Sequence, residues 1–406
     1  MIEGLNTLFV IVTIAAATPI VLGLMPRLGI PAVVIFLVAG VIVGPYALDV
    51  ANPNDVELLS KMGLGFLFLL AGYEVKLKWF RERAGTLAIG GWFISLAIAT
   101  AVTGALELAG YVKAFVPISL ALTTTALGTL LPILRDAGML HGRFRTMVMA
   151  SGAVGELFPV IAIAVFLSST SQFAGLASIV VIGLLAFGLA KLPGLIQGSR
   201  IDSVVSRGVG NTSQTTLRLA VALLVGLLVL ANDLGDDIVL GAFVAGMVLR
   251  RWGPADVNAI DSKLDALGYG FFIPIFFIAS GMGIDIDSIA ESPLRLLVFF
   301  VLLLAVRGLP TMLVYLRDLS PPKRIQLTFL NATALPLLVA LTEIGLRTGT
   351  MLPENAAALV GAGALSVLVF PLIATRIHTR GKKRHPENYV IDADDDKALL
   401  PDIREP

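Results

Sequence analysis

The segment LTTTALGTLLPIL, residues 122–134, has a counterpart in FLNATALPLLVAL, residues 329–341. Both are apolar runs interrupted by proline and by threonine or asparagine. Proline lacks a backbone N–H, and threonine and asparagine side chains form hydrogen bonds that compete with the helix. Irregular backbone at membrane depth is tolerated only where it is buried in protein or lines a water-filled cavity. The pair therefore predicts two interrupted membrane helices beside a binding site, with proline kinks used only for packing as the alternative.

The composition places both segments in a membrane protein. Of 406 residues, 56% are hydrophobic and 15% are charged, and the mean hydropathy is +0.89, a balance typical of polytopic membrane proteins. Runs long enough to cross about 30 Å of hydrocarbon predict an all-α fold with about thirteen transmembrane helices. The first run lacks the basic flank of a cleaved signal peptide, so we expect it to be retained. The predicted cores lie near residues 5–24, 30–48, 57–76, 85–107, 115–138, 146–168, 175–193, 216–231, 237–250, 265–284, 294–316, 324–346 and 355–376.

Three segments recur at nearly constant spacing, which indicates an internal duplication. The matched pairs are Gly40 with Gly246, Gly72 with Gly281, and Thr125 with Thr333. Seven predicted spans, an odd number, separate equivalent positions, so the two copies cross the membrane in opposite directions. Inverted repeats of this kind are typical of secondary transporters, and interrupted helices at corresponding positions of the two halves indicate the binding site. We expect four polar side chains to line it: Thr124, Thr125, Asn331 and Thr333.

The simplest division gives a membrane domain over residues 1–378 and a short tail over residues 379–406. The membrane domain comprises repeat one (5–168), a linker helix (175–193) and repeat two (216–376). The tail is basic and then acidic, and is predicted to be disordered. Loops after odd-numbered spans carry basic residues such as Arg83, Arg143 and Arg317, whereas loops after even-numbered spans are acidic. The positive-inside rule then predicts an outside N-terminus and a cytoplasmic C-terminus in the cell (inner) membrane.

Two charged residues lie near the centre of predicted spans. Glu156, in SGAVGELFPVIAIAVFL (151–167), sits roughly 16 Å into its span at 1.5 Å per residue. Arg307 lies near the middle of the eleventh span. A central charge costs at least about 2.5–3.5 kcal/mol on insertion scales, so such residues face a cavity or one another. One interpretation is a buried ion pair that fixes packing. The functional one is a transient Na+ or K+ and proton site at Glu156, supported by the fixed charge of Arg307.

The number of central carboxylates bears on stoichiometry. Arginine keeps its proton at physiological pH, so only Glu156 is expected to titrate, and one monovalent cation would exchange for one proton without net charge transfer. Three further candidates for the site are Ser151, Glu343 and Glu74. Either of these last two, which lie near predicted span ends, would overturn the one-for-one cycle if it reached the cavity.

The order of motifs resembles that of the monovalent cation:proton antiporters, in particular the cation:proton antiporter-2 family. The segments that carry the resemblance are LTTTALGTLLPILRDAGML, SGAVGELFP, GAFVAGMVL, FFIPIFFIASGMGIDI and LNATALPLLVALTEIG. The resemblance implies a homodimer, a dimer domain of spans 1–3 and 8–10, and a moving core domain of spans 4–6 and 11–13 with two crossing broken helices. It also gives Glu156 the place of the essential aspartate and Arg307 that of the membrane-embedded lysine or arginine. Many relatives have a polar residue where this chain has Gly155.

Other classes fit the sequence less well. HExxH, GxSxG and phosphate-loop patterns are absent, so we expect no enzyme and no cofactor. The net charge of +1 gives no reason to expect nucleic acid. The expected partners are monovalent cations, protons, the lipid bilayer and a second copy of the chain. A potassium-selective efflux channel-like protein and a cation-coupled carrier of an organic anion remain alternatives.

Overall fold

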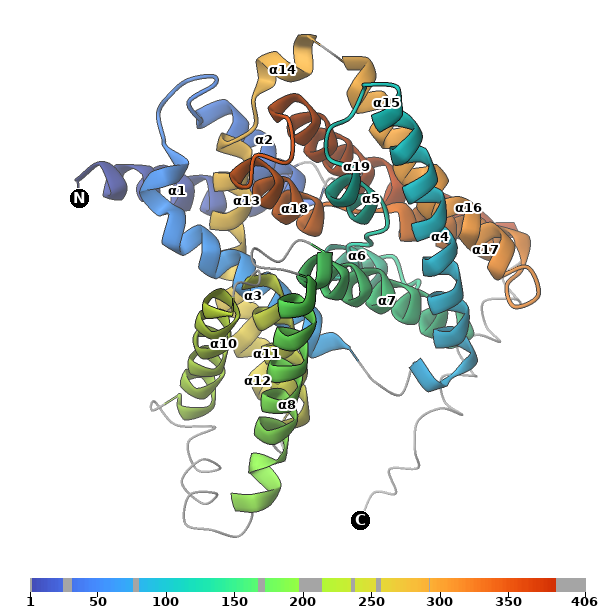
Figure 1. Cartoon of the computed structure of the whole chain (residues 1–406), viewed down its shortest axis with the longest axis horizontal. Helices are drawn as coiled ribbons and strands as arrows, with labels where there is room; N and C mark the ends of the chain where they lie inside the picture. Colours follow the sequence, from blue (N-terminus) through green and yellow to red (C-terminus); the bar gives the residue numbers. More distant parts are fainter. Residues whose placement is uncertain are drawn as a thin grey trace. The chain divides into compact units, whose positions relative to one another are not determined.

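The computed structural model describes residues 2–24, 31–75, 80–166, 172–196, 214–234, 238–252, 257–291 and 293–384. Within these ranges the chain is helical and has no strand. The helices (Figure 1) are α1 (Ile2–Leu24), α2 (Ala32–Val43), α3 (Glu57–Glu74), α4 (Arg83–Leu108), α5 (Phe115–Leu122), α6 (Leu127–Asp136), α7 (Gly142–Phe166), α8 (Gln172–Ile196), α10 (Thr215–Asp233), α11 (Ile238–Trp252), α12 (Val257–Leu267), α13 (Ile273–Met282), α14 (Ile286–Glu291), α15 (Pro293–Leu303), α16 (Leu309–Val314), α17 (Pro321–Ala332), α18 (Pro336–Arg347) and α19 (Pro353–Arg384).

Every predicted span overlaps a helical segment, which confirms the all-helical, multi-pass membrane fold. In the described ranges, nine segments are long and apolar enough to cross a membrane, and shorter apolar helices account for most of the others. The ninth predicted span is α11, whose 15 residues end in Arg250, Arg251 and Trp252. The count of thirteen crossings stays a prediction. At the other end of the chain, α19 continues to Arg384, so residues 379–384 of the predicted tail are helical, and residues 385–406 lie outside the described part.

Both predicted interruptions are present. The fifth span divides into α5 and α6 around residues 123–126, and the twelfth divides into α17 and α18 around residues 333–335. Leu335, the residue before Pro336, has φ −151° and ψ −56°, outside the helical region, which a following proline disfavours. In repeat one the proline, Pro132, instead lies inside α6. Three consecutive threonines mark the earlier break: the Thr123 and Thr124 hydroxyls donate to carbonyl oxygens of the preceding turn, and the Thr125 hydroxyl donates to a carbonyl oxygen of the second broken helix.

The chain forms two compact units. Unit 1 comprises Met1–Val75 and Leu157–Asp287, and unit 2 comprises Lys76–Glu156 and Ser288–Pro406. Unit 1 thus contains spans 1–3 and 8–10 together with the linker helix α8, and unit 2 contains most of spans 4–6 and all of spans 11–13. The division follows the one that the family resemblance implies, except that the boundary falls inside α7, directly after Glu156. Figure 1 shows α8, α10 and α11 of unit 1 side by side.

Unit 1 is held together by glycines at the repeat-matched positions. Helix α2 packs on α13, where a Cβ on Gly40 would lie 2.1 Å from the Ile278 carbonyl oxygen. Helix α3 packs on α11, where a Cβ on Gly246 would lie 2.0 Å from the Leu69 carbonyl oxygen. Gly281 and Gly72 make the reciprocal contacts in the two pairs. The duplication is therefore visible as two equivalent backbone-to-backbone crossings that only glycine permits.

Candidate functional site

The two broken helices contact each other through their extended segments, inside unit 2. The Ala126 N–H donates to the Thr333 carbonyl oxygen at 2.8 Å, and the Thr125 hydroxyl donates to the Asn331 carbonyl oxygen at 2.7 Å. Breaking a helix frees backbone groups that must be satisfied when buried. Here each break supplies part of what the other lacks, so the interruption predicted from sequence is a crossing point rather than a pair of independent kinks.

Glu156 contacts the half-helix that follows the first break. Its side chain is on α7 and is 6% exposed. The Gly128 N–H, in the first turn of half-helix α6, donates to Glu156 Oε1 at 3.2 Å. One residue earlier in α7, the Gly155 carbonyl oxygen accepts the Thr125 N–H at 3.0 Å. The carboxylate therefore caps a helix that begins inside the membrane domain, where free N–H groups and the helix dipole stabilise a negative charge.

Arg307 contacts the first break and α7 through its guanidinium. It lies in a π-helical turn, Leu304–Gly308, and is 2% exposed. Its Nε donates to Thr125 Oγ1 and its Nη2 to the Ser151 carbonyl oxygen, both at 3.1 Å. These acceptors are neutral, and they hold the guanidinium against the break and against α7. Glu156 thus contacts the first turn of α6, and Arg307 contacts Thr125 in the break. That the two charges lie beside one another stays a prediction.

Asn331 links the remaining polar groups. The Ser151 hydroxyl donates to Asn331 Oδ1 at 2.7 Å, and Asn331 Nδ2 donates to Thr311 Oγ1 at 2.9 Å. The Thr311 hydroxyl donates in turn to the Arg307 carbonyl oxygen at 3.0 Å. All four residues are buried. A closed hydrogen-bond network therefore joins α7, the Arg307 turn, α16 and α17, with Arg307 and Asn331 as its two hubs.

Comparison with known proteins assigns the fold to a family. The transmembrane domain of the sodium/hydrogen exchangers matches residues 11–379. The chain belongs to the sodium/hydrogen exchanger family. The solved structure of the sodium proton antiporter MjNhaP1 from Methanocaldococcus jannaschii at pH 8 matches 94% of this chain and 97% of that one, with a TM-score of 0.64 and 17% identity. It shares the fold of this exchanger-family chain.

Two curated relatives illustrate the range of the family. The putative Na+/H+ antiporter YjbQ of Bacillus subtilis is 26% identical over 92% of this chain, and the chain spans 63% of that protein's length. The Na+/H+-K+ antiporter GerN of Bacillus cereus is 24% identical over 75% of this chain, and the match covers 78% of GerN. Proteins of this family are transporters, and their membrane domain is the part that this chain matches.

The other predicted site residues take different places in this exchanger-family fold. Thr124 and Thr333 are buried, but their hydroxyls donate to the Ala121 and Phe329 carbonyl oxygens of their own helices. They therefore satisfy backbone groups at the ends of the half-helices α5 and α17. Glu343 is exposed on α18, and Glu74 ends α3 in unit 1. The structure therefore joins Arg307, Thr125, Asn331 and Ser151 in one hydrogen-bond network, while Glu156 contacts the adjoining first turn of α6. Glu343 lies on the surface of its unit.

Sequence reasoning missed three contributors. Gly128 acts through its backbone N–H, which no side-chain pattern reveals. Thr311 lies four residues after Arg307 on the same helix, a spacing that could have been read as one helical face. Ser366 on α19 supports the second break, since its hydroxyl accepts the Ala334 N–H at 3.0 Å and donates to the Gly363 carbonyl oxygen at 2.7 Å.

The donor set excludes a conventional metal centre in the described part of the chain. No three histidine, aspartate or glutamate side chains converge there, and the chain contains no cysteine. A cation at Glu156 would be held by one carboxylate and neutral oxygens, which suits a weakly held monovalent ion better than a resident transition metal.

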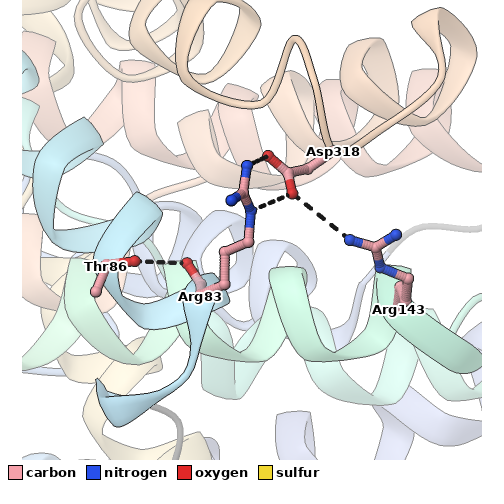
Figure 2. Close-up of polar contacts among 4 residues, drawn as sticks. All are labelled: Arg83, Thr86, Arg143 and Asp318. Carbon is pink, nitrogen blue, oxygen red and sulfur yellow. Dashed lines mark hydrogen bonds and ion pairs between the residues drawn. The ribbon is translucent and has the colours of Figure 1, made fainter.

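Ion pairs join the starts of α4 and α7 to the segment that follows α16 (Figure 2). Asp318 follows α16 and its side chain is 3% exposed, while Arg83 at the start of α4 and Arg143 at the start of α7 are each about two-thirds exposed. Arg83 Nε donates to Asp318 at 2.6 Å, and Arg143 Nη2 lies 3.5 Å from the same oxygen. The hydrogen bond from Arg83 holds the pKa of the Asp318 carboxyl below its usual range.

Proposed function

We propose that the protein exchanges a monovalent cation, Na+ or K+, for protons across the cell membrane by alternating access. One observation carries the proposal: Glu156, a buried carboxylate, caps the half-helix α6 at the point where the two broken helices cross. In inverted-repeat transporters, such interrupted helices form the substrate and ion site. The names of the putative Na+/H+ antiporter YjbQ and of the Na+/H+-K+ antiporter GerN support this activity for the whole protein and leave the preferred cation open.

The chemistry follows from the surroundings of the carboxylate. In one state Glu156 holds a proton, and in the other it is ionised and binds the cation, so a proton and a cation exclude each other at one site. The Gly128 N–H and the α6 dipole stabilise the ionised form. Without this donor, burial would favour the protonated form. The half-helix therefore offsets part of the cost of burying the ionised carboxylate.

The stoichiometry follows from the repeat. The position equivalent to Glu156 in repeat two is Ala364, and the position equivalent to Gly128 is Pro336, which has no N–H to donate. Repeat two therefore lacks both the acid and its backbone donor. Arg307 keeps its proton throughout. We propose one cation exchanged for one proton, with no net charge moved.

We also propose an orientation and an assembly for the protein in its membrane. Basic loops after odd-numbered spans support a cytoplasmic C-terminus and an outside N-terminus. The family resemblance supports a homodimer in the inner membrane. We propose no cofactor and no enzymatic reaction for this fold.

The test is exchange in proteoliposomes under an imposed pH gradient, with Na+, K+ and Li+ compared at zero and imposed membrane potential. The parent protein should dissipate the gradient on addition of at least one cation, and Glu156→Gln should not. Glu107→Gln is the matched control, because Glu107 is exposed at the end of α4 in the same unit.

Three results would contradict parts of the proposal. Full exchange by Glu156→Gln would show that Glu156 is not the site of exchange. A rate that changes strongly with potential would remove the one-for-one stoichiometry. Cation flux that is independent of the pH gradient would favour a channel, and counterflow of an organic acid would favour a carrier.

A further inference from the structure

The space beside Gly155 is filled by the guanidinium of Arg307. A Cβ built on Gly155 would lie 2.6 Å from Arg307 Nη2, 2.6 Å from Thr125 Oγ1 and 2.7 Å from Thr125 Cβ. Real Cβ atoms do not approach heavy atoms so closely, so any side chain at residue 155 would displace the guanidinium or the break. Glycine at this position is thus a condition for the observed place of Arg307.

Repeat two shows what the same position looks like without a charge. Gly363 on α19 is the equivalent of Gly155, and a Cβ there would lie 2.6 Å from Leu338 Cδ1 and 2.9 Å from the Ala334 carbonyl oxygen. Both glycines allow a helix to pass close to a break. Only at Gly155 is the neighbour a guanidinium, and the equivalent of Arg307 in repeat one is Ala99. Close packing alone therefore does not account for the charge beside residue 155.

The guanidinium is held there independently of the state of Glu156. Two of its hydrogen bonds go to neutral oxygens, Thr125 Oγ1 and the Ser151 carbonyl. The π-helical turn that carries Arg307 is itself packed tightly, because a Cβ on Gly308 would lie 2.8 Å from Thr328 Cγ2 on α17. Since residue 155 directly precedes Glu156 in α7, the positive charge lies against the backbone that carries the carboxylate.

We propose that Gly155 is a positioning residue for the exchange: its lack of a side chain admits the Arg307 guanidinium against the turn of α7 that carries Glu156 and so sets the pH range in which protons and cations compete. This inference rests on the proposed function of Glu156. A fixed positive charge disfavours the protonated, neutral acid relative to its anion and also weakens cation binding. A displaced guanidinium should therefore move the pH profile of exchange toward alkaline pH and lower the KM for the cation at high pH.

Other ionisable groups on the elements of unit 2 are placed to matter less. They lie near helix ends, as do Glu107 on α4, Arg135 on α6, Lys323 on α17 and Glu343 on α18. Tyr315, which follows α16, is buried and interacts electrostatically with Arg307. Its phenol stays neutral between pH 6 and pH 9. The pH profile should thus report mainly on Glu156 and Arg307.

The experiment is a double-mutant cycle in the full chain. Gly155→Ala, Arg307→Gln and the double variant are compared with Gly363→Ala, the matched glycine without a charged neighbour. Exchange in proteoliposomes and Na+-dependent thermal stabilisation in detergent are both measured from pH 6 to pH 9. Gly155→Ala and Arg307→Gln should each shift the midpoint toward alkaline pH by about one unit. The double variant should shift no further than Arg307→Gln, and Gly363→Ala should keep the parent midpoint even if it is less stable.

Several outcomes would overturn the inference. An additive shift in the double variant would show that residue 155 acts without Arg307, and an equal shift in Gly363→Ala would reduce the effect to crowding. If Gly155→Ala does not fold, Arg307→Gln and Arg307→Lys decide, because a parent-like midpoint for Arg307→Gln would remove the role of the charge. Failure of the proposed function is separate: it would appear as exchange that survives Glu156→Gln.

Discussion

Units 1 and 2 solve the packing of membrane helices in different ways. In unit 1, unbroken helices cross at Gly40, Gly72, Gly246 and Gly281, where backbone meets backbone. In unit 2, broken helices meet through hydrogen bonds, and buried polar side chains are concentrated there. Of those in the described residues, only Thr7, Thr18 and Ser178 belong to unit 1. The contrast teaches that one duplicated sequence supplies both a stiff scaffold and a polar crossing, according to which residues interrupt its spans.

The repeats differ again within unit 2. At each break a neighbouring helix packs closely through a glycine, Gly155 of α7 at the first and Gly363 of α19 at the second. Only the first has an acid bound to a backbone N–H at the start of its half-helix and an arginine against the break. Symmetry therefore builds the crossing, and departures from symmetry supply the chemistry.

The largest expected effect comes from making repeat one like repeat two. Glu156→Ala reproduces Ala364 and should reduce exchange at least about 100-fold, because no other group at the crossing can hold the exchanged proton. The measurement is cation-induced dissipation of a pH gradient in proteoliposomes. The protein should remain monodisperse, as expected when a buried charge rather than a packing group is removed. Retained exchange would mean that the two breaks differ less than their residues indicate.

The next effect tests the glycine crossings of unit 1. Gly246→Ala places a Cβ 2.0 Å from the Leu69 carbonyl oxygen and should cost about 1–3 kcal/mol of stability, since backbone cannot yield as a side chain can. Gly226→Ala on α10 is the control, because its Cβ meets nothing within 4 Å. It should be neutral or slightly stabilising. Thermal unfolding in detergent measures both effects. Equal Tm values for Gly246→Ala and Gly226→Ala would contradict the conclusion that unit 1 depends on close glycine crossings.

A smaller effect is expected for the hydrogen-bond hub of unit 2. Asn331→Ala removes the link between Ser151 and Thr311, but both hydroxyls keep a carbonyl acceptor, at Val148 and Arg307. The cost should therefore lie near the lower end for buried hydrogen bonds, about 1 kcal/mol. Thermal unfolding checks this cost. A loss as large as that of Gly246→Ala would show that unit 2 also depends on rigid packing at its centre.

The smallest effect concerns Asp318, which joins the helix ends of unit 2. Its pKa is lowered by the Arg83 hydrogen bond, so its contribution to stability is present above the unfolded pKa of about 4 and is lost as pH falls through the lower folded value. Asp318→Asn should lower Tm slightly at pH 7, and the difference from the parent should disappear in acid and shrink in high salt. A difference that grew on acidification would contradict this assignment.

Much of this arrangement could be predicted from the sequence. The spans, the repeat, the two breaks and the central Glu156 and Arg307 all leave local signals, namely apolar run length, matched glycines, proline and threonine in helices, and charge in an apolar run. Glu343 was a reasonable candidate from its place near a span end, and only its exposure on α18 removes it from the contacts of the crossing. The roles of Gly128 and Gly155 could not be predicted, because one acts through a backbone N–H and the other through the absence of a side chain.

The sequence by itself determined that the chain is a helical membrane protein with a repeated, twice-broken helix and one central acid, because these properties depend on hydropathy and backbone chemistry along the chain. Only the tertiary structure decided which N–H reaches Glu156, which oxygens hold Arg307 and what fills the space at Gly155. Those contacts join residues as far apart as 125 and 331, and their distances depend on how whole helices pack.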